Sequence, residues 1–240
     1  MILKIVTFGG VTMRIGGYDK LSTVDYPGEM ACAIFLVGCN FNCGYCHNPS
    51  LISGDGNYIP KEEVMDYLKL RKDMLDAVCI SGGEPTCNPD LKDFIKEIKA
   101  LGYKVKLDTN GTNPKMLKEL VESGLVDYVA MDVKGSLMKY KEIAGAPHLD
   151  LDNIQKSIDL LKSDVVDYEF RTTIVDEFHN EVDMMSMGRL LKGAKRLYLQ
   201  KFQISDGVIN KNLHPVDEDS INKFVDILKE YIDEVDTRGY

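Results

Sequence analysis

The chain has 240 residues, 44% of them hydrophobic, which is enough to build one sizeable core. It carries 38 acidic and 29 basic side chains, and the net charge of −9 argues against a broad phosphate-binding surface. No apolar run reaches the roughly 18 residues that a membrane-spanning helix needs. Composition therefore excludes nucleic acid and membrane from the expected partners.

Residues 1–10 are too short and too weakly apolar for a secretory signal, so we expect a cytoplasmic protein. Met13 could equally be a start, and residues 1–13 are treated as an extension. We expect a single domain over 1–240 with its core at about 28–210. Six cysteines in a cytosolic chain indicate metal ligation and ordinary burial rather than disulfides.

In chain order, the glycines and proline of segment 15–28 predict a hairpin or a loop. The apolar run 31–37 predicts a buried strand. Directly after it, Cys39, Cys43 and Cys46 form a C-x3-C-x2-C motif. Such a loop can wrap three thiolates around a four-iron cluster, which leaves one iron without a protein ligand.

Two other interpretations of these cysteines stay open. A structural zinc site needs four ligands, and the fourth candidate, His47, adjoins Cys46, where two neighbouring side chains rarely reach one tetrahedral ion. Alternatively, the three cysteines are reduced, buried thiols, which requires chance to place three of six within eight residues. The spacing favours the iron–sulfur cluster.

Beyond the cysteines, predicted strands and helices alternate. Further strands are predicted at 77–80, 104–107, 128–131, 168–174 and 196–202, and helices at 60–69, 91–98, 114–123, 151–162, 184–191 and 220–231. Six strand–helix units predict an α/β fold with a parallel sheet. Because six units are too few to close an eight-stranded barrel, we expect a partly open (β/α)6 barrel with its site at the carboxyl ends of the strands.

The C-x3-C-x2-C motif, with Tyr45 just before its last thiol, resembles the signature of the radical S-adenosylmethionine (SAM) superfamily. Gly82-Gly83-Glu84, at the end of the second predicted strand, is similar to that superfamily's Gly-Gly-Glu motif. The resemblance implies a partial (β/α)6 radical SAM barrel. It also implies a [4Fe–4S] cluster on Cys39, Cys43 and Cys46, with SAM on the open iron.

Most candidate SAM-binding residues follow the predicted strands. They are Tyr45, Cys46, His47, Gly82, Gly83, Glu84, Asp108, Asp132, Val133, Lys134, Arg171 and Gln203. The family pattern implies that the Gly-Gly-Glu segment contacts the SAM amino group and that Asp132 and Lys134 face its ribose and carboxylate. It also makes a monovalent cation a candidate at Asp108, Thr109 and Asp132. No side chain is expected to be catalytic beyond the cluster and SAM.

Two of these candidates carry open questions. Arg171 lies in an apolar strand, and a buried guanidinium needs a partner, which is either the SAM carboxylate or a core aspartate. Gln203 stands where the similar pyruvate formate-lyase activating enzyme has a histidine contact to SAM, so it is only a substitute donor.

His47-Asn48 after the last thiol resembles the activating enzymes of glycyl-radical proteins. The implied activity is reductive cleavage of SAM followed by hydrogen abstraction from a glycine of a partner enzyme. The first choice of partner is anaerobic ribonucleotide reductase and the second is pyruvate formate-lyase, with flavodoxin or ferredoxin as electron donor. The alternatives are a 7-carboxy-7-deazaguanine synthase-like enzyme and a non-enzymatic iron–sulfur or zinc binding module.

The remaining cysteines and histidines are assigned no chemistry. Cys32 and Cys79 lie in apolar strands and are read as core residues, whereas Cys87 lies near the Gly-Gly-Glu segment and its role stays open. No cysteine follows Cys87 in this sequence, which excludes an auxiliary C-terminal cluster. For His148, His179 and His214 we expect surface or packing roles.

Overall fold

The computed structural model describes residues 13–54 and 56–240. These form one eight-stranded sheet in which the strands follow one another in chain order. The strands are β1 (Ile15–Ser22), β2 (Ala31–Leu36), β3 (Ala77–Gly82), β4 (Lys104–Thr109), β5 (Tyr128–Asp132), β6 (Asp167–Ile174), β7 (Arg196–Lys201) and β8 (Glu234–Arg238). β1 is antiparallel to β2, and all later neighbours are parallel.

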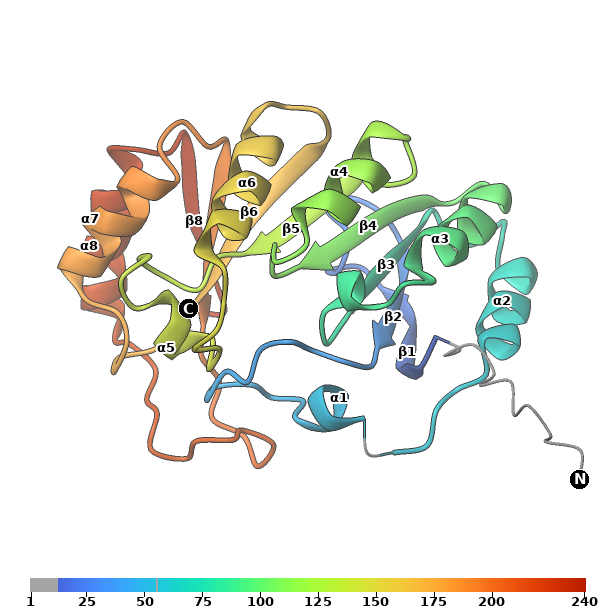
Figure 1. The fold of residues 1–240 in the computed structure, drawn as a ribbon, viewed down its shortest axis with the longest axis horizontal. Coiled ribbons are helices and arrows are strands. Elements are labelled where there is room, and N and C mark those ends of the chain that lie inside the picture. Colours follow the sequence, from blue (N-terminus) through green and yellow to red (C-terminus); the bar gives the residue numbers. More distant parts are fainter. Residues whose placement is uncertain (1–12, 55) are drawn as a thin grey trace, which may run out of the picture.

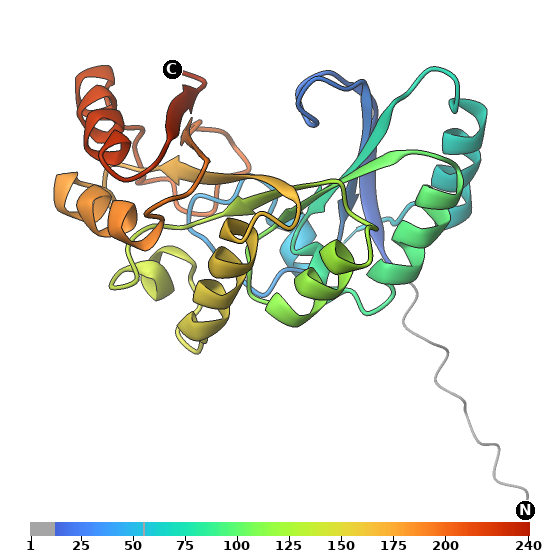
Figure 2. The same cartoon turned by 90° about the horizontal axis from the view of Figure 1, so that it is seen from above.

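Most of the helices follow parallel strands and cover one face of the curved sheet, whereas two short ones lie below the strands in Figure 1. The helices are α1 (Ser50–Ser53), α2 (Lys61–Leu70), α3 (Leu91–Ala100), α4 (Pro114–Glu122), α5 (Tyr140–Ile143), α6 (Leu151–Lys162), α7 (Glu181–Leu190) and α8 (Glu218–Lys229), with a short 3₁₀ helix at Pro85–Cys87. In Figure 2 the β1–β2 hairpin and the C-terminal strand stay apart, so the sheet forms an open trough.

Side-chain caps explain where several helices begin. The Asn113 side chain accepts a hydrogen bond from the Met116 N–H at the start of α4, and Pro114 occupies the first turn, where no N–H is needed. Asn180 and Asp183 form a reciprocal capping box at the start of α7. These short-range signals set the first residues of α4 and α7.

The two faces of the sheet differ in chemistry. On the helix-covered face, Ile34, Val78 and Val129 belong to one large apolar core. The inner face of the trough instead carries small side chains and buried charged ones, including Lys106 and Glu169. Because buried charges are costly unless they are paired, this inner face must hold a network of ion pairs.

The predicted α/β fold with an open barrel is confirmed, and each of the six predicted strands matches an observed parallel strand to within two residues at either end. Segment 15–28, predicted as a hairpin or a loop, contains β1, which forms an antiparallel hairpin with β2. One strand was missed, since β8 extends the parallel sheet beyond the last predicted helix. Of the proposed extension at residues 1–13, residues 1–12 lie outside the described residues. Within 13–54 and 56–240, no helix combines the length and apolarity needed to span a membrane.

Candidate active site

A cavity of about 140 Å³ lies at the carboxyl ends of the central strands. The loop after β2 and the ends of β3, β4 and β5 supply its walls. Its lining residues are Cys39, Phe41, Cys43, Tyr45, Cys46, Asn48, Ile52, Ser81, Gly82, Gly83, Glu84, Asp108, Thr109, Asn110, Asp132 and Lys134. Four segments that are far apart in the sequence thus meet at the edge where parallel α/β folds place their sites.

All three cysteines of the motif line this cavity. Cys43 is buried and its Sγ lies 3.7 Å from the Ala144 carbonyl oxygen, while Cys39 Sγ accepts a hydrogen bond of 3.4 Å from the Phe41 N–H. Burial raises the pKa of the Cys39 thiol to about 12 and raises that of Cys43 as well. Among the described side chains, no three His, Cys, Asp or Glu converge closely enough to hold a metal ion. As a metal-binding thiolate, Cys43 would no longer carry the proton that it now directs to the Ala144 carbonyl oxygen.

The two glycines of the Gly-Gly-Glu segment pack against the chain that leads into the cysteine loop. A Cβ on Gly82 would lie 2.4 Å from backbone atoms of Leu36, and one on Gly83 would lie 2.2 Å from the Gly38 carbonyl oxygen. The Gly83 N–H donates to Leu36 O at 2.8 Å, and the Glu84 N–H donates to Gly38 O at 2.7 Å. The glycines are needed here for backbone-to-backbone contact, in addition to any role toward a ligand.

Glu84 is 0% exposed and accepts hydrogen bonds from the elements around it. Its Oε1 accepts from the Thr86 N–H and hydroxyl and, at 2.8 Å, from the Thr109 hydroxyl, and its Oε2 accepts from the Asn110 N–H at 2.6 Å. Burial raises the pKa of Glu84 in spite of these donors. Oε2 therefore keeps room for one more donor, and the carboxylate joins the ends of β3 and β4.

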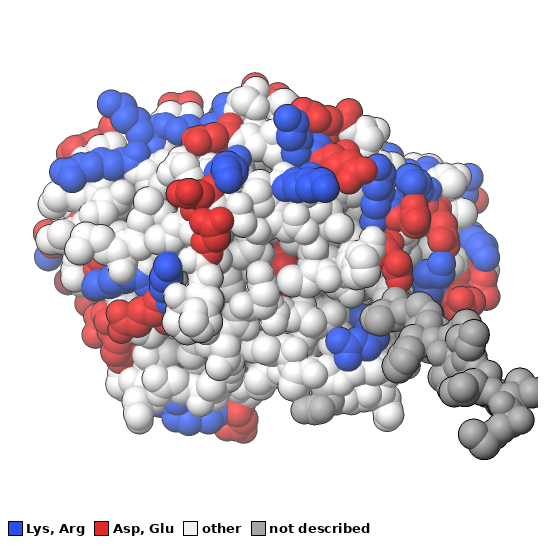
Figure 3. Space-filling model, viewed as in Figure 1, with Lys and Arg blue, Asp and Glu red and all other residues white. Residues whose placement is uncertain are grey.

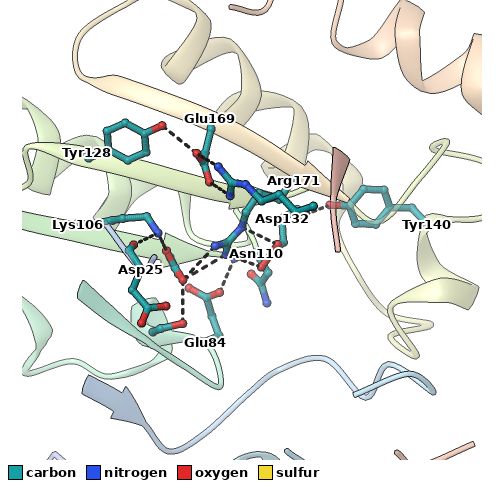
Figure 4. Close-up of polar contacts among 12 residues, drawn as sticks. Asp25, Glu84, Lys106, Asn110, Tyr128, Asp132, Tyr140, Glu169 and Arg171 are labelled. Carbon is teal, nitrogen blue, oxygen red and sulfur yellow. Dashed lines mark hydrogen bonds and ion pairs between the residues drawn. The ribbon is translucent and has the colours of Figure 1, made fainter. Parts of the chain in front are cut away.

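Behind the cavity, two aspartates share one guanidinium (Figure 4). Arg171 donates from Nε and a terminal nitrogen to the two oxygens of Asp132, each at 3.3 Å, and from the other nitrogen to Asp108 at 3.3 Å. Core aspartates, one of the two kinds of partner considered for Arg171, thus pair with its guanidinium. Burial alone would raise the pKa of Asp108, but Arg171 and then Lys106 outweigh it and lower that pKa.

Lys134 contributes a cation to the cavity wall. Its Nζ lies 5.8 Å from the centre of the Tyr45 ring, in cation–π contact. Tyr45 is buried, and its hydroxyl has no hydrogen-bond partner among the described residues. Lys134 lies in the loop after β5 and Tyr45 in the cysteine loop, so their contact joins these two loops at one wall of the cavity.

Four predicted site residues do not line the cavity. His47 is exposed, and its Nδ1 lies 3.2 Å from Ser205 Oγ in the loop after β7. Val133 is buried in the apolar core, Arg171 lies behind the aspartates, and Gln203 is exposed at the end of β7. Sequence position alone could not separate these from true lining residues.

Sequence reasoning also missed five lining residues, which are Phe41, Asn48, Ile52, Ser81 and Asn110. Ser81 and Asn110 adjoin residues that were selected, since Ser81 lies near the carboxyl end of β3 and Asn110 directly follows β4. The signal that could have found them is the position at the carboxyl end of a strand rather than the residue type.

The other histidines and cysteines lie away from the lining. His179 is buried, with Nε2 3.1 Å from the Lys134 carbonyl oxygen, and burial lowers its pKa. His214 is exposed and pairs with Glu177 at 2.6 Å. Cys32 and Cys79 are buried, as predicted, whereas Cys87 is exposed.

Comparison with known proteins adds independent information. A sequence model of the radical SAM superfamily matches residues 33–187. A protein of Methanocaldococcus jannaschii named "Putative glycyl-radical enzyme activating enzyme" is 36% identical over 227 residues, which cover 92% of this chain and 94% of that protein.

Two solved structures show the same fold at low identity. Streptococcus suis SuiB bound to SAM matches with a TM-score of 0.66 and 17% identity, over 84% of this chain and 48% of that one. A domain of a pyruvate-formate lyase-activating enzyme from Bacteroides vulgatus matches with a TM-score of 0.55 and 16% identity, over 68% of this chain and 99% of that one. At such identities these matches establish the fold alone.

Proposed function

Because the chain belongs to the radical SAM superfamily, whose enzymes use a [4Fe–4S] cluster and SAM, we propose that it activates a glycyl-radical enzyme. The observation that carries this proposal is the single cavity in which all three motif cysteines meet the polar ends of β3, β4 and β5. The near full-length similarity to a relative named as such an activating enzyme supports the same activity.

We assign cluster binding to Cys39, Cys43 and Cys46. The donor set fits, because three soft thiolates on one loop suit iron and leave a coordination position for SAM. When bound, the cluster and SAM supply reductive cleavage of a carbon–sulfur bond and abstraction of a hydrogen atom. The buried walls of the cavity exclude water from this chemistry.

The cavity walls offer complementary groups for SAM. Lys134 is the cation that we assign to its carboxylate, and Glu84 Oε2 is the acceptor that we assign to its amino group. Asp132 is held in place by Arg171, and Tyr45 is assigned to the adenine side. Arg171 therefore acts as a positioning residue, and Gln203 and His47 lie outside this set.

We propose anaerobic ribonucleotide reductase as the first choice of partner and pyruvate formate-lyase as the second. The His47-Asn48 continuation supports a glycyl-radical partner, and flavodoxin or ferredoxin would supply the electron in the cytoplasm. A 7-carboxy-7-deazaguanine synthase-like activity stays as the alternative. A non-enzymatic binding module is not supported, because the superfamily match makes the chain an enzyme.

The test begins with anaerobic reconstitution of the cluster, reduction with dithionite and addition of SAM. We expect 5′-deoxyadenosine, and then an organic radical by electron paramagnetic resonance (EPR) when a candidate partner is added. Replacing Cys43 by Ala should abolish both products, whereas the exposed Cys87→Ser should retain them. Formation of 5′-deoxyadenosine without a radical on any glycyl-radical partner would refute the proposed activation.

A further inference from the structure

Lys106 is a buried lysine on the inner face of the trough. It is 2% exposed, and its ammonium lies 3.0 Å from Asp108 Oδ1 as an ion pair outside hydrogen-bond geometry. The ammonium also donates to the Asp25 carbonyl oxygen in the loop between β1 and β2 (Figure 4). Burying a lysine ammonium costs free energy unless its charge is paired.

The charges of the side chains that contact Asp108 and Asp132 sum to zero with those of the two aspartates. Asp108 and Asp132 carry two negative charges, and Lys106 and Arg171 carry two positive ones at contact distance. Without Lys106 this buried cluster would keep one uncompensated negative charge. A small cation from solution is the ligand that such a carboxylate pair would then attract.

The side chains do not fit the exchangeable monovalent cation that the family pattern suggests at Asp108, Thr109 and Asp132. Asp108 Oδ2 accepts from the Ser81 hydroxyl at 2.9 Å and from Arg171 at 3.3 Å, which fills both of its lone pairs, and each oxygen of Asp132 accepts one hydrogen bond from Arg171. The Thr109 hydroxyl donates to Glu84 and accepts from the Gly111 N–H, so only one of its lone pairs is left. Asp108 Oδ1 faces the Lys106 ammonium.

We propose that Lys106 is a built-in replacement for that ion, which holds Asp108 and makes SAM binding independent of sodium and potassium. Asp108 lines the cavity, so its position and charge act directly on whatever binds there. Lys106 itself does not line the cavity, and it acts through Asp108 as a positioning residue.

The test measures SAM binding to the reconstituted enzyme in choline, sodium and potassium chloride at equal ionic strength, so that screening is the same throughout. For the wild type we expect dissociation constants that agree within about twofold. For Lys106→Met we expect binding weakened at least about tenfold in choline, because a buried carboxylate loses its partner, and restored saturably by sodium or potassium. Lys104→Met, an exposed lysine two residues away on the same strand, is the matched control and should behave as the wild type.

A second measurement does not depend on the cluster or on SAM. The thermal midpoint of the cluster-free wild type should not respond to sodium or potassium, whereas that of Lys106→Met should rise saturably. Saturable stimulation of the wild type by either ion would overturn the inference, as would a Lys106→Met enzyme equally weak in all three salts. If Lys106→Met does not fold, the salt dependence of the wild type alone still tests the inference. The inference rests on the proposed SAM site. If the wild type bound no SAM in any of the three salts, the SAM site would be refuted. The thermal titration would then still test whether Lys106 replaces a bound cation.

Discussion

At Gly83 the end of β3 lies against the backbone of the cysteine loop, and an added Cβ would stand 2.2 Å from the Gly38 carbonyl oxygen. Because that neighbour is backbone, the loop itself would have to shift in Gly83→Ala. We expect the variant to lose roughly 1–3 kcal/mol of unfolding free energy. It should also incorporate less iron on reconstitution.

Gly17→Ala provides the control for this prediction. Gly17 lies in β1, and among the described residues nothing stands within 4 Å of a Cβ added there. Denaturant unfolding and iron content of the two variants would be compared. A Gly83→Ala protein that matches Gly17→Ala in both would show that the close contact with Gly38 does not hold the cysteine loop.

Lys134 is the cation of the cavity wall, and Lys134→Met should weaken SAM binding while leaving the cluster in place. Loss of a charge-assisted contact costs about 1.5–3 kcal/mol, which corresponds to roughly a tenfold to hundredfold higher dissociation constant. Equilibrium binding to the reconstituted enzyme measures this. Lys141→Met, an exposed lysine on α5, is the control, and equal affinity of the two variants would exclude the assigned role.

Among the elements, β8 pairs with β7 through its backbone and is also tied to the trough through one buried carboxylate. Glu169 of β6 accepts hydrogen bonds from both terminal nitrogens of Arg238, at 2.7 and 2.8 Å, and from the Tyr128 hydroxyl, at 2.9 Å (Figure 4). Three strands therefore meet at this side chain. Burial alone would raise the pKa of Glu169, but the Arg238 guanidinium outweighs it and holds that pKa below its usual range.

This shift makes the stability of the fold depend on pH. Since the native pKa of Glu169 is lower than its unfolded value, its contribution is present above the unfolded pKa and is lost as pH falls through the native one. At pH 7, Glu169→Gln should lower the unfolding free energy by about 1.5–3 kcal/mol, because the charge-assisted hydrogen bonds to the half-exposed Arg238 are lost. The difference in unfolding free energy between the wild type and Glu169→Gln should become smaller below roughly pH 4.

Urea unfolding from pH 7 to pH 3 checks this expectation. Glu230→Gln, an exposed residue beyond α8, serves as the control and should follow the wild type at every pH. A gap between wild type and Glu169→Gln that stays constant, or widens, on acidification would contradict the assigned ion pair.

The same elements show what the sequence could and could not predict. Strands such as β3 and β5 were found because they are buried on both faces and read as apolar runs. β8 was missed because Asp236 and Arg238 interrupt any apolar run, and it pairs on one side only. The cysteine motif spans eight neighbouring residues, so it could be recognised without knowing the fold. The pairing of Arg171 with Asp108 joins residues 63 positions apart, which only the folded chain brings together.

On the scale of the whole molecule, the surface below the strands carries fewer charged side chains than the surface around it. Charged side chains gather along the helical rim in Figure 3, while the lower part, where Figure 1 places α1 and the loop after β7, is mostly uncharged. That loop contacts the cysteine loop through the Asn210 N–H, which donates to Gly44 O at 2.8 Å. It also exposes Ile204, which is 65% accessible.

We expect this loop to contact the partner enzyme. Ile204→Asp should lower the yield of glycyl radical on the partner by about tenfold, because it places a charge in a largely uncharged contact, while 5′-deoxyadenosine formation without partner stays unchanged. The control is Leu70→Asp, which is 75% exposed at the end of α2, the helix that leads back to the amino edge of the sheet. Equal radical yields from the two variants would place the partner elsewhere.

The central claim is that three cysteines leave one iron of a cube open for SAM. The most direct measurement is the EPR spectrum of the reduced, reconstituted protein recorded with and without SAM under anaerobic conditions. The account predicts a [4Fe–4S] signal whose g values shift on addition of SAM. A spectrum that SAM does not change, or a protein that holds tetrahedral zinc in place of iron, would contradict it.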